Sequence, residues 1–312
     1  MRTSGTTPAT VQAYPLSTRV ALEALGSFFI VFAGLATALF SPTGSAATIG
    51  FAYGLALLVC LIAFGHVTNG YFNPAFSLAM AVAGRIKWLS MVLYVVAQTI
   101  GALLASVVLL ALLKVMPAGA TPETPKLFGA LANGFDSHSP SQVPMVGVLI
   151  VEIVLMAVLV AVLLGATSSR NKSTMGPIAV GLAFAVAIVI TMPLSNGSLN
   201  PARATSVVFL ADSWAMGQLW LFWLAPLFGA ALAAAIYRSF APASAPAPVQ
   251  EPVDGLVSSD TPEPATAPAE DDDESALPKP VPAVPAAKES PAASEAAAKK
   301  NDAQDFFDSK GK

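Results

Sequence analysis

The triplet Asn-Pro-Ala occurs twice in this chain, at Asn73-Pro74-Ala75 and at Asn200-Pro201-Ala202. Asparagine is a favoured N-cap and proline a favoured first residue of a helix, so each triplet predicts a helix start. Both triplets lie between long apolar segments, which predicts two short helices that begin inside a membrane. Broken helices at membrane depth are tolerated only where they are packed in protein or line a cavity. The pattern therefore indicates a pore or a binding site.

The two triplets belong to the two halves of an internal repeat. The pattern Ala-x-Gly-Leu-Ala occurs at 52–56 and again at 179–183, and each time its glycine precedes the motif asparagine by 19 residues. A glutamate lies 50 residues before the first motif asparagine and 48 before the second. The landmarks thus follow the same order in both halves: Glu23, Gly54 and Asn73, then Glu152, Gly181 and Asn200.

The composition is that of a membrane protein. The chain has 312 residues, of which 55% are hydrophobic and 11% charged, whereas soluble domains carry about 25% charged residues. A membrane-spanning helix needs about 20 mostly apolar residues. Six segments meet this requirement, three in each half: 19–40, 47–65, 88–113, 143–166, 177–194 and 218–239.

Three spans in each half place the second half upside down relative to the first, so the halves form an inverted repeat. The sequence therefore predicts an all-α membrane protein of six transmembrane helices and two re-entrant half-helices that meet near the middle of the bilayer. We expect an N-terminal segment at 1–17 and a channel-like domain at 18–240, with halves at about 18–115 and 143–240.

Basic residues predict the orientation. Most of them fall on the side of this arrangement that carries both termini, and such loops face the cytoplasm. The N-terminus and the C-terminus are therefore both predicted to be cytoplasmic. The residues that indicate this are Arg2, Arg19, Arg85, Lys87, Arg170, Lys172 and Arg238.

The last part of the chain, 241–312, differs from the rest. It holds six Lys and fourteen Asp or Glu, a net charge of −8, and is rich in proline and alanine. Such a composition cannot bury a core. We expect a disordered, acidic, cytoplasmic extension, and the sequence leaves open whether it only solvates the chain or also docks on a partner.

The motifs resemble those of the aquaporin (major intrinsic protein) family. The resemblance rests on the doubled Asn-Pro-Ala, on Arg203 after the second copy, and on Glu23, Gln98, Glu152 and Phe222-Trp223. It implies a passive channel for water, and for small neutral solutes such as glycerol, ammonia or hydrogen peroxide, in the plasma (inner) membrane. It also implies a homotetramer and no cofactor, metal, catalytic chemistry or nucleic-acid partner.

Physical chemistry gives the two motifs and Arg203 a role in such a pore. Each motif asparagine can cap its helix with its side-chain oxygen and leave amide hydrogens for a passing solute. The two helix N-termini and a fixed Arg exclude cations and protons in channels of this type. A charge at membrane depth is costly and normally marks a pathway.

Matching to the family implies a narrow ring of four residues: Tyr53, Ile188, Gly197 and Arg203. Ile188 stands where water-specific relatives have His, and Gly197 is smaller than their Cys or Thr, so we expect a wider, more apolar filter with relaxed selectivity. His66 and Ser198 are expected to line the pore.

Glu23 and Glu152 are expected to support the loops that carry the motifs; the alternative is a proton relay. A glycerol-type facilitator, and less readily a coupled secondary carrier, remain alternatives to a water channel.

Overall fold

The computed structural model describes residues 14–41, 44–116 and 123–240. The predicted acidic tail at 241–312 and residues 1–13 of the predicted N-terminal segment lie outside these ranges.

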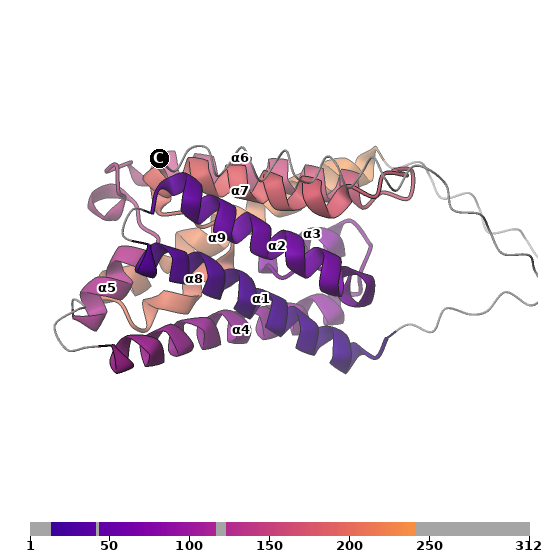
Figure 1. Ribbon diagram of the computed structural model, residues 1–312. Coiled ribbons are helices and arrows are strands. Elements are labelled where there is room, and N and C mark those ends of the chain that lie inside the picture. The colour runs from indigo at the N-terminus through magenta and orange to yellow at the C-terminus, as the bar shows by residue number, and fades with distance from the viewer. Residues whose placement is uncertain (1–13, 42–43, 117–122, 241–312) are drawn as a thin grey trace, which may run out of the picture. The chain divides into compact units, whose positions relative to one another are not determined.

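Within these ranges, six long helices, all apolar enough to cross a membrane, form the bundle in Figure 1. Each of them corresponds to one predicted span, with α6 beginning two residues later than predicted, so the prediction of six spans is confirmed. Their bounds are α1 (Leu16–Phe40), α2 (Ala46–Thr68), α4 (Trp88–Val115), α6 (Met145–Ala166), α7 (Gly176–Ser195) and α9 (Ser213–Ser239).

Two short helices begin at the prolines of the triplets: α3 (Pro74–Val82) and α8 (Pro201–Val208). The connection between α4 and α6 holds two more elements that the sequence analysis did not expect, α5 (Thr124–Leu131) and the 3₁₀ turn η1 (Asp136–His138).

The two ends of the bundle differ in what they carry (Figure 1). At one end, here called the terminal end, α1 begins, α9 ends, and the α3–α4 and α6–α7 connections turn. At the opposite end, here called the loop end, lie α5, η1 and the α8–α9 connection.

Helix packing follows the internal repeat. In the first half α1 packs on α4, and in the second half the equivalent helices α6 and α9 pack on each other. The halves meet where α2 packs on α7, which are also equivalent. Each short helix packs on the last long helix of the opposite half, α3 on α9 and α8 on α4. The contacts are therefore those of a pseudo-two-fold arrangement.

Glycines set the distances at these crossings. A Cβ on Gly54 of α2 would lie 2.5 Å from the carbonyl oxygen of Gly181 on α7, and one on Gly181 would lie 2.9 Å from the oxygen of Gly54. A Cβ on Gly101 would overlap the Ala24 carbonyl, and one on Gly229 would overlap that of Ile153. All three crossings thus need a residue without a side chain, because the facing atoms are backbone.

We expect Gly54→Val to destabilise the bundle, because the added carbons meet α7 backbone that cannot rotate away. Overpacking of this kind costs about 1–3 kcal/mol. The matched control is Gly65→Val on the same helix, where a Cβ has no neighbour within 4 Å. Melting temperatures of the purified proteins in detergent measure the difference; equal values for the two variants would contradict the close crossing.

Candidate functional site: two helix tips and a buried arginine

The N-termini of α3 and α8 meet in the interior of the bundle. Asn73 caps α3 by accepting from Ala75 N at 2.9 Å, and Asn200 caps α8 by accepting from Ala202 N and Arg203 N at 3.0 and 3.2 Å. The Asn73 amide nitrogen donates to Leu199 O at 2.9 Å, which joins the two halves at their tips. That amide has two hydrogens, so one remains available beyond this bond.

The loops before the two triplets have the same backbone conformation. In the first loop Asn69, Gly70 and Phe72 have φ of 70°, 69° and 50°. In the second loop the equivalent residues Asn196, Gly197 and Leu199 have φ of 64°, 65° and 52°. This region favours glycine and, after it, asparagine. The repeated Asn-Gly pair four residues before each motif asparagine is the sequence signal of this conformation, and the sequence analysis missed it.

Glu23 and Glu152, both fully buried, hold these loops. Glu23 accepts from the backbone N–H groups of Tyr71 at 3.1 Å and Phe72 at 2.6 Å. Glu152 accepts from the Leu199 N–H at 2.9 Å and the Ser195 hydroxyl at 2.8 Å. Each carboxylate thus accepts hydrogen bonds from backbone N–H groups of its loop, which have no partner in a helix or a sheet.

Side chains on α4 and α9 bond to the two short helices from positions that are not equivalent in the repeat. The Gln98 amide nitrogen donates to Glu23 Oε2 at 2.6 Å and to the Ser77 hydroxyl of α3 at 2.9 Å. On the other side, the Trp223 indole donates to the Thr205 hydroxyl of α8 at 2.9 Å.

Arg203 lies in the first turn of α8 with only 3% of its surface exposed. Its guanidinium donates to the Tyr53 hydroxyl at 3.2 Å, to the Asn196 carbonyl at 2.9 Å and to Asn133 Oδ1. Arginine has five N–H donors, and three are used here, so two remain.

Asn133 is the residue in this cluster that sequence reasoning missed. It precedes η1, and its amide nitrogen also donates to the carbonyls of Ser195 and Asn196, both at 3.0 Å. It therefore fixes the arginine and the second loop together. A lone polar residue in a long connection gave no signal of this role.

The remaining residues of the predicted ring lie close to Arg203 or to one another. The Tyr53 ring occupies the space beside Gly34, where a Cβ would overlap it. A Cβ on Gly197 would lie 3.3 Å from Ile188 Cγ2 and 2.6 Å from the sulfur of Met192. The space that a small residue at 197 would open is thus occupied in part by Met192, one helical turn beyond Ile188. The positive φ of residue 197 is a second reason why glycine is favoured at this position.

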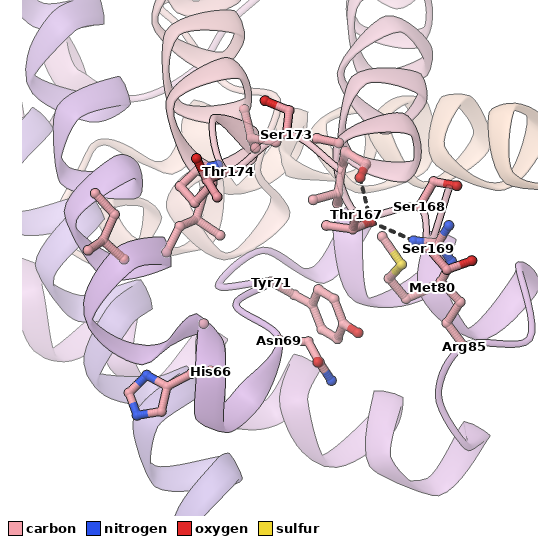
Figure 2. A pocket seen from close by; sticks show the side chains of 18 of the residues that line it. His66, Asn69, Tyr71, Met80, Arg85, Thr167, Ser168, Ser169, Ser173 and Thr174 are labelled. Carbon is pink, nitrogen blue, oxygen red and sulfur yellow. Dashed lines mark hydrogen bonds between the residues drawn. The ribbon is translucent and has the colours of Figure 1, made fainter. Parts of the chain in front are cut away.

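His66 borders a cavity of about 860 Å³ at the terminal end. In the view of Figure 2, His66 and Arg85 lie on opposite sides of this cavity, with Tyr71 between them. Ser198 lies elsewhere, buried in the second loop, and its hydroxyl has no hydrogen-bond partner among the described residues.

A model of the family described as Major intrinsic protein matches residues 10–237. The chain belongs to this family. Two relatives, both named Aquaporin Z, come from Photorhabdus laumondii and Bradyrhizobium diazoefficiens. Each is 36% identical over 225 residues, which are 70% of this chain and 96% and 92% of the relatives. A solved aquaglyceroporin from Plasmodium falciparum has the same fold, with a TM-score of 0.61 and 18% identity over 72% of this chain and 97% of its own. Membership and the six apolar helices make this a multi-pass membrane protein.

We expect Glu152→Ala to destabilise this protein, because Leu199 N–H loses its acceptor in the interior. An unsatisfied buried donor costs about 1–3 kcal/mol. Glu152→Gln keeps an acceptor oxygen and should cost less. Glu123→Ala is the control, since Glu123 is exposed and, among the described residues, its side chain pairs only with Lys126, at 3.6 Å. Melting temperatures in detergent test this order; a Glu152→Ala protein as stable as the control would show that the carboxylate does not support the loop.

Proposed function

We propose that this chain is a passive channel for water and small uncharged solutes that excludes ions and protons. The observation that carries the proposal is the meeting of two helix N-termini at Asn73 and Asn200, with Arg203 beside them. The Aquaporin Z relatives support water as the main permeant. The chain carries no enzymatic activity in this proposal.

The mechanism follows from the charges around the tips. Each helix N-terminus carries roughly half a positive charge, and Arg203 adds a full one. A cation at this point is repelled and has lost much of its hydration. A neutral molecule instead receives hydrogen bonds from the free amide hydrogens of the motif asparagines and from the unused donors of Arg203.

We assign roles to the residues on this basis. Asn73, Pro74, Ala75 and Asn200, Pro201, Ala202 form the central constriction. Tyr53, Ile188, Gly197 and Arg203 form the selectivity filter, with His66 and Ser198 lining the pore on either side. Glu23 and Glu152 support the loops. Their carboxylates accept from backbone donors in equivalent ways, which favours this role over a proton relay.

The proposal includes an arrangement in the membrane. The channel domain is 18–240, its halves are inverted, α3 and α8 are re-entrant, and four copies assemble in the plasma membrane. The terminal end faces the cytoplasm, because it carries Arg85, Lys87, Arg170, Lys172 and Arg238, and loops rich in Lys and Arg stay on the cytoplasmic side.

Stopped-flow light scattering on proteoliposomes tests the function. We expect osmotic shrinkage to be much faster than in protein-free vesicles, faster for water than for glycerol, and unaffected by imposed proton or sodium gradients. Glycerol flux equal to water flux would favour a glycerol-type facilitator. Dependence on either ion gradient would indicate a coupled carrier instead.

Arg203→Ala should make the channel leak. The fixed charge at the filter is lost while the helix dipoles remain, so we expect a measurable proton conductance and at least about a tenfold rise in glycerol flux, equivalent to roughly 1.4 kcal/mol of barrier. Arg203→Lys keeps a charge but loses the contacts to Tyr53 and Asn133. We therefore expect it to raise glycerol flux more than it raises proton conductance. An unchanged permeability profile in well-folded Arg203→Ala would remove this residue from the pore.

Met192→Ala should raise the ratio of glycerol to water permeability, because the side chain fills space beside Gly197 and Ile188. A barrier lower by about 1 kcal/mol gives a roughly fivefold increase. Met175→Ala, at an exposed position on the terminal end, is the matched control. Equal ratios in the two variants would show that Met192 does not narrow the filter.

A further inference from the structure

The cavity of about 860 Å³ at the terminal end is rich in hydrogen-bond donors, and none of the described residues that line it is acidic. Arg85 is the one Lys or Arg in this part of the lining. Most of the other polar groups are hydroxyls, and in the view of Figure 2 those of the α6–α7 connection lie across the cavity from Tyr71. The hydroxyl residues are Tyr71, Thr167, Ser168, Ser169, Ser173, Thr174 and Tyr237.

Acidic side chains of the described ranges lie away from this cavity or are buried. Glu23 and Glu152 are fully buried and accept hydrogen bonds from the two loops. Glu123, Asp136 and Asp212 lie in connections at the loop end. The terminal end instead carries further basic residues, so an anion that enters here meets attraction and little fixed negative charge. These basic residues are Arg19, Lys87, Arg170, Lys172 and Arg238.

Arg85 is held in place by its backbone and by its side chain. It follows Gly84, whose φ is 76°, and its N–H donates to Met80 O at 2.8 Å, which is the Schellman closure of α3. The guanidinium donates to the Thr167 hydroxyl, to Leu164 O at 3.1 Å and to the Tyr237 hydroxyl at 2.9 Å, all neutral acceptors. Three of its five N–H donors are thus used among the described residues, and the charge has no partner there.

The helix ends at the cavity add to this field. α7 begins at Gly176, and this residue and Pro177 both line the cavity. The N-cap of α7, Met175, makes no side-chain cap bond, so the positive end of this helix stays open. Carbonyls at the C-terminal end of α6 are covered by donors, from Arg85 and from the Asn171 amide.

We propose that this cavity binds a small phosphate monoester. The phosphate lies at the two remaining donors of Arg85, because a guanidinium fork matches phosphate oxygens. The rest of the molecule lies against the hydroxyls of the α6–α7 connection. A cavity of about 860 Å³ is within the range of small-molecule sites and larger than one phosphate needs, which favours an ester over the bare ion.

An occupied cavity should slow permeation, because His66 and Tyr71 line it and Tyr71 lies two residues before Asn73. This effect on permeation rests on the proposed function, whereas the binding does not.

Calorimetric titration of the whole chain in detergent, at constant ionic strength, tests the binding. The probes are glycerol 3-phosphate, inorganic phosphate and glycerol. We expect glycerol 3-phosphate to bind most tightly and glycerol most weakly. No saturable binding of the ester, tighter binding of inorganic phosphate, or equal binding of glycerol and its phosphate would overturn the proposal.

Two variants with the same charge change locate the site. Arg85→Gln should weaken binding of glycerol 3-phosphate at least about tenfold, since the bonds it loses are charge-assisted. Arg238→Gln is the control, because Arg238 is exposed, donates to Val82 O at 3.1 Å and does not line the cavity. Equal weakening by both would mean attraction to the whole terminal end and no site.

A second pair decides the matter if Arg85→Gln does not fold. Ser169→Ala with Thr174→Val removes two exposed hydroxyls that have no hydrogen-bond partner among the described residues, so stability should not change. We expect several-fold weaker binding of the ester. The control, Ser17→Ala with Thr18→Val, changes exposed residues of the same end that lie outside the cavity. Equal affinities of the two double variants would overturn the proposal.

Stopped-flow measurement with glycerol 3-phosphate on both sides of the vesicles tests the effect on permeation. At a concentration equal to the measured dissociation constant, half of the channels are occupied and water permeability should fall to about half. Arg85→Gln should lose this inhibition. Unchanged permeability of the original chain at saturating ester would overturn the block, and no water permeability without the ester would refute the proposed function while the titration still decides the site.

A lipid headgroup carries the same phosphate chemistry. Short-chain phosphatidic acid is therefore titrated in the same way. If it bound more tightly than glycerol 3-phosphate and depended equally on Arg85, the site would take lipid, and a soluble ligand would be ruled out.

Discussion

The structure depends on two carboxylates that occupy the interior of a membrane protein. A chain that turns back inside a bundle buries backbone donors in packed protein, and each such donor is costly unless it is paired. Glu23 and Glu152 pair with the donors of the two loops, which allows α3 and α8 to begin at depth. The position of the helix tips, and with it the position of Arg203, follows from these contacts.

Much of this arrangement could be predicted from the sequence. Long apolar segments fix the spans, and Asn followed by Pro fixes the start of a short helix, because both are local properties of the chain. The contacts of Asn133 could not be predicted, because its partners Arg203 and Ser195 lie more than 60 residues away. The position of Met192 beside Gly197 could not be predicted for a similar reason. Its proximity to Gly197 arises from how α7 meets the loop, and no spacing encodes it.

Gly197 illustrates how one residue can satisfy two constraints. Comparison with other filters treats it as a small side chain that widens the pore. Its φ of 65° is close to the φ of 69° of Gly70, the equivalent residue of the other loop, which is not a member of the proposed filter. The backbone thus favours glycine at this position on its own account, and in the proposed filter the side chain of Met192 fills part of the space beside it.

The bond between Asn73 and Leu199 has a consequence for how the chain is made. Its two partners are 126 residues apart, and at a synthesis rate of about 5–20 residues per second the second partner emerges roughly 6–25 s after the first. Throughout this interval the Asn73 amide lacks its Leu199 partner, and Gly54 lacks the α7 backbone that it packs against. The first half therefore cannot complete the contacts of its own helix tip, and the final position of Asn73 is reached only after the second half has been made.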